Sequence, residues 1–277
     1  MTKRKRDPDA QPDPDAQADV AFPGLPFHVA VSLVEKHLHD PSDLANLRGV
    51  SRGMRAAVDA TGRKIEEFGE WEAAERGYLS SLKRLRERGR LQDECLLCAA
   101  AARNGDLEDL KALRAEDSPW DEETCAGAAK YGHLEVLRWA RERENDCPWD
   151  WETCAAAAKG GHLEMLKWAR ANGCPWDEWT CRFAADFGHL EVLKWARANG
   201  CPWGEEMRRD MCAKAAEDGH LEVLKWAHEN DCPWSELTCE WAAMGGQIDV
   251  LKWARENGCP WDEDTRELAA SMGYVET

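Results

Sequence analysis

The feature that most constrains this chain is a glycine that returns about every 27 residues through most of its length. Successive glycines of this set lie 28, 27, 29, 27, 31, 27 and 27 residues apart. They are Gly77, Gly105, Gly132, Gly161, Gly188, Gly219, Gly246 and Gly273. An Ala-Ala pair precedes each of them by four and three positions. A period of this length indicates a repeat array, in which each unit is stabilised by near-copies of itself.

One unit reads TCRFAADFGHLEVLKWARANGCPWDEW and predicts two short helices. Thr180 is a suitable N-cap for the first helix, and Gly188 permits the tight turn that ends it. His189 begins a second helix, whose apolar side chains recur at helical spacing. Asn199-Gly200 supplies the C-terminal stop, and the proline that follows cannot continue the helix.

Each unit is too small to bury its apolar face alone, so the units must stack. The alanine pairs let neighbouring helices approach closely, while Leu and Trp fill the space between layers. The predicted fold is therefore all-α, an α-solenoid of stacked helix–turn–helix pairs. We expect a tail over residues 1–21, a separate helical segment over 22–64, and an array of about seven units plus a partial last one over 65–277.

Charge is distributed unevenly along the chain. Its 277 residues include 36 Lys or Arg and 53 Asp or Glu, which gives a formal net charge of −17. Residues 1–64 hold 10 basic and 9 acidic side chains, so the remainder carries −18. Such an acidic surface repels phosphate, which argues against nucleic acid as a ligand.

Two features of the chain predict its compartment. No stretch approaches the roughly 20 apolar residues of a membrane span, and the N-terminus has no apolar signal core. We therefore expect no membrane contact, no secretion, and a cytoplasmic or nuclear location. The run Lys3–Arg6 is typical either of a nuclear-import signal or of a charged, solvated tail.

The repeat unit resembles the ankyrin repeat over about residues 65–277. TC-x-x-AA-x-x-GHLEVLKWARANG follows that family's T-P-L-H-x-AA-x-x-GH-x-E-V-V-x-x-L-L-x-x-G. The resemblance implies an ankyrin-like solenoid that binds other proteins. Cys replaces Pro after the threonine, and the unit is about six residues shorter than the usual 33. We therefore expect recognition through the first helices and the loops before them.

Residues 22–62 have a different pattern, which is similar to an F-box. Leu-Pro precedes an apolar helix, then Asp-Pro-x-Asp-Leu and Leu-Arg-x-Val-Ser-Arg follow. The resemblance implies docking on the adaptor subunit of a cullin-type ubiquitin ligase. The residues that would make the adaptor contact or the local core are Leu25, Pro26, Leu33, Leu38, Leu44, Leu47 and Val50. Alternatively, these helices only cap the N-terminal end of the array.

Ten of the twelve cysteines recur in two columns, one at the position after the threonine and one before Pro-Trp, and the other two, Cys95 and Cys98, have the ordinary i, i+3 spacing of a helix. No zinc-knuckle pairs occur within the columns, so we expect small, buried, apolar thiols and neither metal nor cofactor. A metal-binding or redox-sensing role is the alternative. The repeated histidines, such as His189, are expected to tighten the turns between units through backbone hydrogen bonds. No nucleophile elbow, phosphate loop or metalloprotease motif occurs, so we predict no enzyme.

Aromatic residues that occur in one unit only are the candidate contacts for a partner, since the repeat frame does not require them. They are Trp151, Trp179, Phe183, Phe187 and Trp241. Local packing would also explain them. Eight residues separate Trp203 from Cys212, where other units have four. This insertion, with Arg208 and Arg209, predicts either a loop on the binding face or a tolerated insertion.

The sequence thus predicts a non-catalytic, monomeric protein-interaction array. The leading hypothesis is a substrate receptor of a ubiquitin ligase, with the adaptor bound by residues 22–62 and the target by the unit-specific aromatics. A plain ankyrin-type scaffold is the alternative.

Overall fold

The computed structural model describes residues 27–63, 67–230, 232 and 234–274, and for residues 205–209 it describes the backbone alone. Leu25 and Pro26 of the predicted adaptor contact lie outside these residues. The described chain is all-α, with 18 helices and no strand, which confirms the predicted fold class. The chain divides into two compact units, residues 1–100 and residues 101–277.

Three helices open the first unit, and they are followed by seven helix pairs and a last single helix. The first three are α2 (Phe27–His37), α3 (Pro41–Val50) and α4 (Arg52–Ala60). The pairs are α5 (Glu70–Glu75) with α6 (Leu79–Glu87), α7 (Cys95–Asn104) with α8 (Leu107–Ala115), α9 (Glu122–Lys130) with α10 (Leu134–Ala140), α11 (Trp151–Lys159) with α12 (Leu163–Ala171), α13 (Glu178–Asp186) with α14 (Leu190–Ala198), α15 (Glu205–Glu217) with α16 (Leu221–Glu229), and α17 (Glu236–Met244) with α18 (Ile248–Glu256). The last helix is α19 (Glu263–Ser271).

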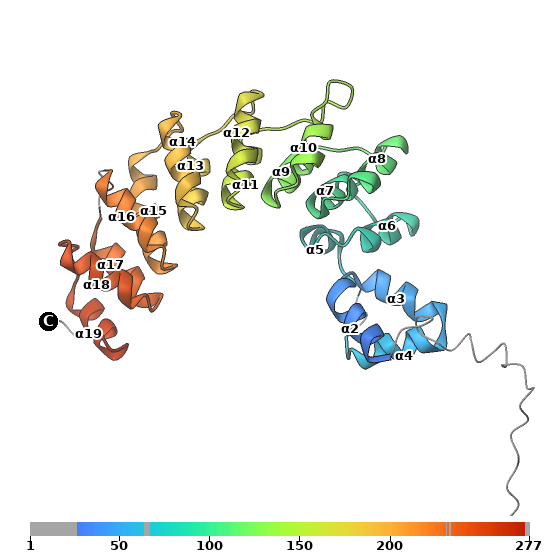
Figure 1. Ribbon diagram of the computed structural model, residues 1–277, viewed down its shortest axis with the longest axis horizontal. Coiled ribbons are helices and arrows are strands. Elements are labelled where there is room, and N and C mark those ends of the chain that lie inside the picture. The colour runs from blue at the N-terminus through green and yellow to red at the C-terminus, as the bar shows by residue number, and fades with distance from the viewer. Residues whose placement is uncertain (1–26, 64–66, 231, 233, 275–277) are drawn as a thin grey trace, which may run out of the picture. The chain divides into compact units, whose positions relative to one another are not determined.

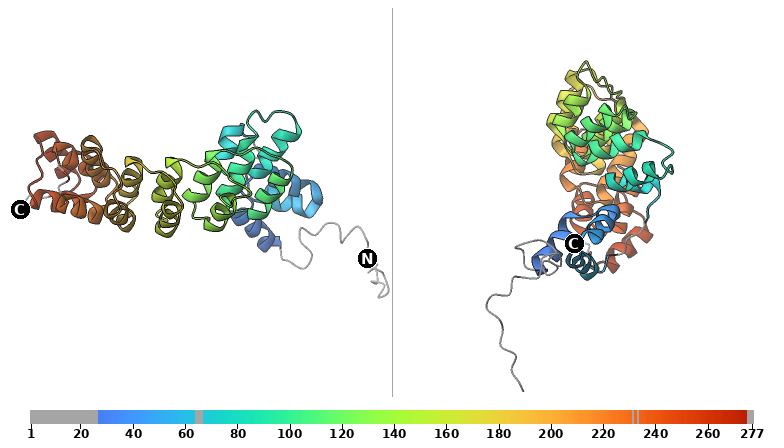
Figure 2. Two further views of the ribbon diagram at one scale, coloured as in Figure 1. Left: turned by 90° about the horizontal axis from the view of Figure 1, so that it is seen from above. Right: turned by 90° about the vertical axis from the view of Figure 1, so that its right-hand side faces the viewer.

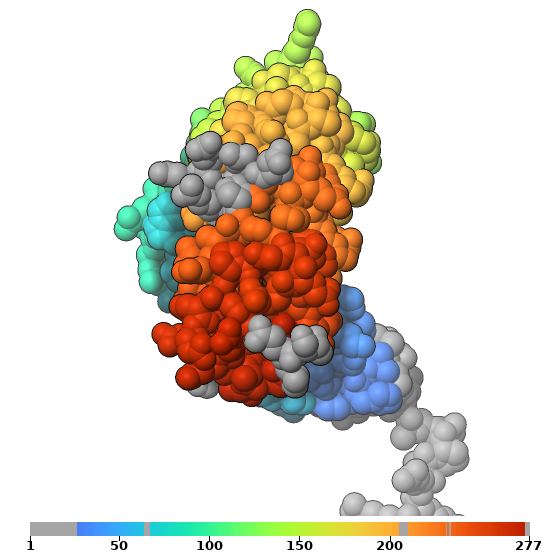
Figure 3. All heavy atoms as spheres, turned by 90° about the vertical axis from the view of Figure 1, so that its left-hand side faces the viewer, coloured from blue at the N-terminus to red at the C-terminus, as the bar shows by residue number. Residues whose placement is uncertain are grey.

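In the second unit the first helix of each pair packs against the first helix of the next pair. The chain of contacts runs from α9 through α11, α13, α15 and α17 to α19. Figure 1 shows these pairs following one another side by side, and Figure 2 shows the same order from two further directions. Figure 3 views this stack from its C-terminal end, with α17, α18 and α19 in front.

The core of the stack repeats as the sequence does. Each second helix contributes one leucine with no exposed surface, namely Leu137, Leu166, Leu193, Leu224 and Leu251. The alanine pairs on the first helices, such as Ala184 and Ala185, are also fully buried. Burial of one leucine contributes roughly 1.5–3 kcal/mol, so each unit depends on a surface that its neighbours supply.

The first helices begin earlier than the threonine pattern predicts. Asp177 is the N-cap of α13, and its Oδ1 accepts from the amide of Trp179 at 3.0 Å. Thr180 lies one turn inside the helix with no exposed surface. The prediction of Thr180 as N-cap is therefore wrong. The aspartate of Pro-Trp-Asp precedes the threonine and caps the free amides at the start of the helix.

The repeated histidines join neighbouring units. His133 Nε2 donates to the carbonyl of Arg103 at 2.9 Å, and His189 Nε2 donates to the carbonyl of Lys159 at 3.1 Å. His162 and His220 make the same bond one unit away. The predicted role of these histidines in tightening the turns between units is confirmed.

The glycine of each turn leaves room for the next unit's histidine. Gly161 has φ +74°, and a Cβ added to it would lie 2.6 Å from Nδ1 of His189. This contact explains why the turn position holds glycine beyond its need for a positive φ.

An arginine at or just after the end of five of the second helices makes a second repeated contact, which we call the arginine clamp. Arg197 Nη1 donates to the carbonyl of Cys201 at 2.6 Å, and its guanidinium lies 4.6 Å from the ring of Trp203. Arg114, Arg141, Arg170 and Arg255 repeat the arrangement at 4.2–4.5 Å from their tryptophans. Each such tryptophan also packs on an aromatic ring of the next unit, as Trp176 does on Trp195 at 5.8 Å.

The insertion before Cys212 is helical. It extends α15 to 13 residues where its neighbours have 9, so the prediction of a loop is wrong. Arg208 and Arg209 lie in this first part of α15.

In the first unit, Asp40 joins α3 to α6. Its carboxylate accepts from the amide of Ser42 at 2.8 Å, from the amide of Ser81 at 2.8 Å and from the Ser81 hydroxyl at 2.5 Å. Asp40 is 7% exposed, so a buried charge is balanced here by three hydrogen bonds. These bonds fix the N-cap of α3 on the helix pair that follows it.

Candidate functional site

The two sides of the repeat array in the second unit differ in chemistry. The second helices carry exposed glutamates paired with lysines three residues later, such as Glu191 with Lys194 at 3.1 Å. The large apolar side chains that are exposed in this unit lie instead on the first helices or on the residue that follows them. They are Tyr131, Trp179, Phe187, Leu237, Met244 and Met272. We call the side that carries them the first-helix face.

An aromatic strip crosses this face along α13. The ring centroids of Trp179 and Phe183 are 5.5 Å apart, and those of Phe183 and Phe187 are 6.5 Å apart. Lys159 of the preceding unit lies 5.3 Å from the Phe183 ring and 5.0 Å from the Phe187 ring. Trp179 is 41% exposed and Phe187 46% exposed. The structure thus brings three of the predicted contact residues together, and two of them present open ring faces.

The other two predicted aromatics lie apart from the strip. Trp151 is the first residue of α11 and is half-buried. Trp241 occupies on α17 the repeat position that Phe183 has on α13, and it is also half-buried.

The neighbouring side of α13 carries an ion pair that the sequence analysis missed. Arg182 Nε lies 2.7 Å from a carboxylate oxygen of Asp186, and the side chains are 17% and 13% exposed. Burial raises the pKa of Asp186, and the Arg182 guanidinium opposes that rise. An i, i+4 pair of opposite charge was the available signal. Arg182 also reaches Asp210 of α15 at 3.7 Å, so this pair helps to orient α13 against its neighbour.

Carboxylates line the edge of the first-helix face where α9, α11 and α13 begin. This carboxylate rim consists of Glu122, Glu123, Asp150, Glu152, Asp177 and Glu178. Desolvation raises the pKa of Glu152, and the charges of Asp150, Glu123, Asp177 and Glu122 raise it further. Desolvation and carboxylate neighbours also raise the pKa of Asp177. The rim residues are therefore close enough to repel one another.

The two cysteine columns pack against each other. The columns are buried throughout, as predicted. The hydrogen bond with Cys201 and burial both raise the pKa of the Cys181 thiol. Contrary to the expectation of thiols alone, a disulfide joins Cys212 to Cys232. Among the described residues, no group of three or more His, Cys, Asp or Glu side chains could hold a metal ion.

The predicted adaptor residues divide into core and surface. Leu44 is 1% exposed and packs with Val34 and Val58, while Leu38 and Leu47 lie at the edge of that cluster. Leu33 and Val50 are 38% and 68% exposed. Only these last two are open to a partner among the adaptor residues that the structure describes.

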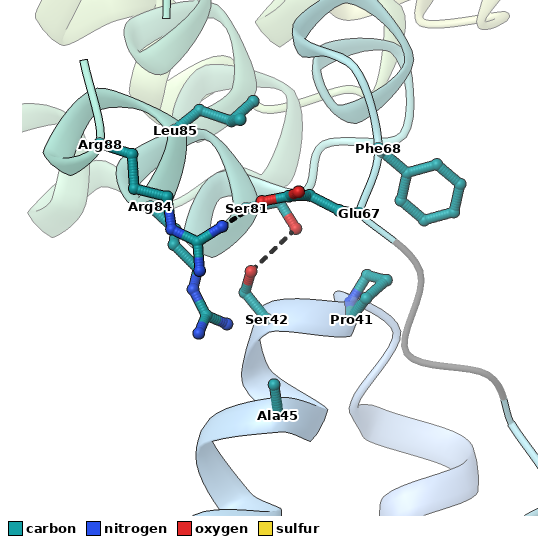
Figure 4. A pocket seen from close by; sticks show the side chains of 9 residues that line it. All are labelled: Pro41, Ser42, Ala45, Glu67, Phe68, Ser81, Arg84, Leu85 and Arg88. Atoms are coloured by element: carbon teal, nitrogen blue, oxygen red, sulfur yellow. Dashed lines mark hydrogen bonds and ion pairs between the residues drawn. The ribbon is translucent and has the colours of Figure 1, made fainter. Parts of the chain in front are cut away.

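A shallow pocket of about 290 Å³ opens beside the link between α3 and α6. Figure 4 shows Ser42 and Ser81 in hydrogen-bond contact on its floor and the Arg88–Glu67 ion pair across it. Its polar groups are largely engaged with one another, so the pocket is part of the joint between these helices.

Comparison with known proteins found one matching family model and several similar solved structures. A family model for ankyrin repeats in many copies matches residues 154–197. The crystal structure of the human ASB11 ankyrin repeat domain is similar to this chain at 14% identity and a TM-score of 0.48, covering 65% of this chain and 99% of that one. The maize pentatricopeptide repeat protein PPR10 is similar at 16% identity and a TM-score of 0.42, covering 94% of this chain and 46% of that one.

No curated protein matches the sequence. Within the described residues, no helix has the length and apolar character needed to cross a membrane.

Proposed function

We propose that the repeat array of residues 65–277 is a non-catalytic protein-binding module whose partner docks on the first-helix face. The observation that supports this most is the segregation of exposed apolar side chains onto that face, with the aromatic strip of α13 among them. Exposed aromatic rings supply much of the binding energy at protein interfaces. The second helices expose Glu–Lys pairs, which suit contact with water.

Partner capture with two matched variants tests this proposal. Trp179→Ala/Phe187→Ala removes the open rings, and Lys167→Ala/Lys194→Ala changes two exposed residues of the second helices. We expect the first variant to lose at least about tenfold of the proteins that the wild-type array captures, because each lost hot-spot side chain costs about 2 kcal/mol or more. The second variant should retain them. Equal capture by both variants would refute docking on this face.

We further propose that residues 22–64 bind the adaptor subunit of a cullin-type ubiquitin ligase, which would make the chain a substrate receptor. The F-box-like sequence supports this, as does the exposure of Leu33 and Val50 beside a formed core. Leu33→Asp/Val50→Asp should abolish binding to purified adaptor while circular dichroism shows an unchanged helix content. Leu44 is unsuitable for this test because its replacement would damage the core. Intact adaptor binding by the double variant would refute the proposal.

The alternative function is a plain scaffold whose N-terminal helices only cap the array. The bonds of Asp40 to Ser81 favour it, because they hold α3 against α6. Wild-type protein that shows no affinity for adaptor would decide for the scaffold.

A further inference from the structure

We infer that the partner segment recognised by the first-helix face is basic, with Arg or Lys side chains against the carboxylate rim and apolar side chains on the aromatic strip. This inference rests on the proposed function and adds the chemical class of the partner. It requires three steps: that the rim charge is uncompensated, that the rim adjoins the strip, and that a peptide can reach both.

Among the described residues, the rim carboxylates differ from the repeated glutamates of the second helices, which have lysine partners. None of the six forms an ion pair within the part of the chain that the structure describes. The second helices provide the contrast, since Glu164, Glu191 and Glu222 each lie 2.7–3.1 Å from a lysine. Charge on the second helices is thus neutralised locally, whereas charge on the rim is available to a partner.

Helix dipoles offset only part of the negative charge of the rim. A carboxylate at a helix N-terminus is stabilised by about 0.3–1 kcal/mol, which lowers its pKa. The pKa values of Glu152 and Asp177 are instead raised, by desolvation and by the neighbouring carboxylates. The carboxylates at the N-termini of α9, α11 and α13 therefore carry more negative charge than the three helix dipoles offset. A cation from a partner would reduce the repulsion between these carboxylates.

The rim and the strip are parts of one surface. Asp177 and Glu178 directly precede Trp179, which begins the strip. Lys159 lies over the far end of the strip, at Phe187. The face therefore runs from carboxylates through open aromatic rings to a cation, and the end beside Trp179 is the one that suits a basic side chain. A cation there would also contact the Trp179 ring face.

The repeat spacing favours an extended peptide. Neighbouring packed helices lie about 8–10 Å apart, and a polyproline II segment advances about 3.1 Å per residue with three residues per turn. A segment in this extended conformation that crosses α9, α11 and α13 would therefore place every third side chain, on the same side of the peptide, opposite successive helix N-termini. We expect basic residues at about this spacing, with apolar residues between them.

Three synthetic peptides and two charge-matched variants test the inference by fluorescence anisotropy. The peptides are fluorescein-labelled (Leu-Ser-Arg)4, its acidic counterpart (Leu-Ser-Glu)4 and the less apolar (Ser-Ser-Arg)4. The rim variant is Glu152→Gln/Asp177→Asn/Glu178→Gln, in which Asn retains the ability to cap α13. The control, Glu164→Gln/Glu191→Gln/Glu222→Gln, changes the net charge equally on the second helices.

We expect (Leu-Ser-Arg)4 to bind the wild-type protein and to lose about tenfold in affinity to the rim variant, but less than about threefold to the control. (Leu-Ser-Glu)4 should not bind, and (Ser-Ser-Arg)4 should bind more weakly. Equal losses in the two variants would show attraction to diffuse charge and would overturn the inference, as would absence of binding. If the Trp179→Ala/Phe187→Ala variant still lost its captured proteins in that case, the proposed function would stand without this partner class.

Discussion

At the scale of single residues, the repeat positions are determined by contacts with the next unit. Gly161 illustrates this, because its positive φ and the ring of His189 each exclude a side chain. Gly173 has a similar φ of +84°, yet a Cβ there would meet nothing within 4 Å. Replacing Gly173 therefore measures the free-energy cost of the backbone conformation alone, whereas replacing Gly161 measures that cost together with the clash between units.

Gly161→Ala should destabilise the protein more than Gly173→Ala. Both changes place alanine at a positive φ, which costs roughly 1–2 kcal/mol. Only Gly161→Ala also drives a methyl group into the His189 ring, which adds about 1–3 kcal/mol of overpacking. Urea unfolding of both variants measures the difference. Equal losses would mean that the histidine yields freely and that the contact does not constrain the turn.

Glu152 gives a second prediction at this scale. Its carboxyl faces Asp150, Glu122, Glu123 and Asp177, and desolvation and these charges raise its pKa above the ordinary 4.5. Because folding raises this pKa, protonation of Glu152 favours the folded state. Ionised Glu152 destabilises the folded protein at pH values above the folded-state pKa, and this cost in free energy disappears as the pH falls from the folded-state pKa to below the ordinary pKa of glutamate.

Glu152→Gln should therefore stabilise the protein at pH 7 and have no stabilising effect at pH values below the ordinary pKa of glutamate. Urea unfolding at a series of pH values measures this change, and a carboxyl NMR titration of the wild type locates the pKa. A midpoint at or below 4.5 would contradict the repulsion that we assign to the rim.

At the scale of the helices, periodicity predicted most of what the structure contains. The glycine spacing and the alanine pairs predicted the helix–turn–helix pairs of the array. This was possible because stacked helices need small residues at fixed positions. The sequence misplaced the N-cap, because Thr180 and Asp177 are both good caps and only the backbone path selects one. It also predicted a loop in place of the longer α15, because insertions in repeat arrays commonly form loops. Residues 205–211 contain no glycine or proline, which is compatible with the helix found there.

The candidate site was less predictable than the helices. Three of the aromatic residues outside the repeat frame, Trp179, Phe183 and Phe187, lie together because they share one side of a helix at i, i+4 and i+8, and their role as partner contacts stays a prediction. Sequence reasoning missed Tyr131, Leu237, Met244 and Met272, whose exposure depends on the stacking of the units. It also missed the arginine clamp, although an arginine lies four residues before the cysteine of Cys-Pro-Trp in three units.

The arginine clamp yields a prediction for the ends of the second helices. Arg170 donates to the carbonyl of Cys174 and lies 4.2 Å from the Trp176 ring. In α16, His228 is at the equivalent place, and its ring is tilted against that of Trp234 with the centroids 4.0 Å apart. Arg170→Ala should cost about 1–3 kcal/mol in urea unfolding, through the charged hydrogen bond and the cation–π contact.

Arg170→Lys should recover little of that loss, because an ammonium group lacks the planar stack. Full recovery by lysine would show that charge alone maintains the clamp.

At the scale of the whole molecule, the stability of each repeat unit depends on its contacts with the neighbouring units. Within residues 101–277, four histidines and a series of tryptophan pairs join neighbouring units, so a local defect is expected to loosen its neighbours first. The N-terminal helix α3 and helix α6 are linked mainly through Asp40, because its carboxylate accepts from both of them, and the Ser81 hydroxyl also lies 3.2 Å from that of Ser42. Removal of Asp40 tests whether the N-terminal helices support the pair that follows them.

Asp40→Ala should cost about 2–4 kcal/mol, because it leaves the Ser42 amide and both Ser81 donors without their acceptor. Hydrogen exchange, resolved by helix, then separates the two roles proposed for residues 22–64. If these helices cap the array, exchange should accelerate in α5 and α6 as well as in α2–α4. If they form an independent adaptor-binding segment, acceleration should stop at α4, and adaptor affinity should fall with it. Unchanged exchange in both regions would show that Asp40 couples neither, and the buried hydrogen bonds would then lack the energetic role assigned to them.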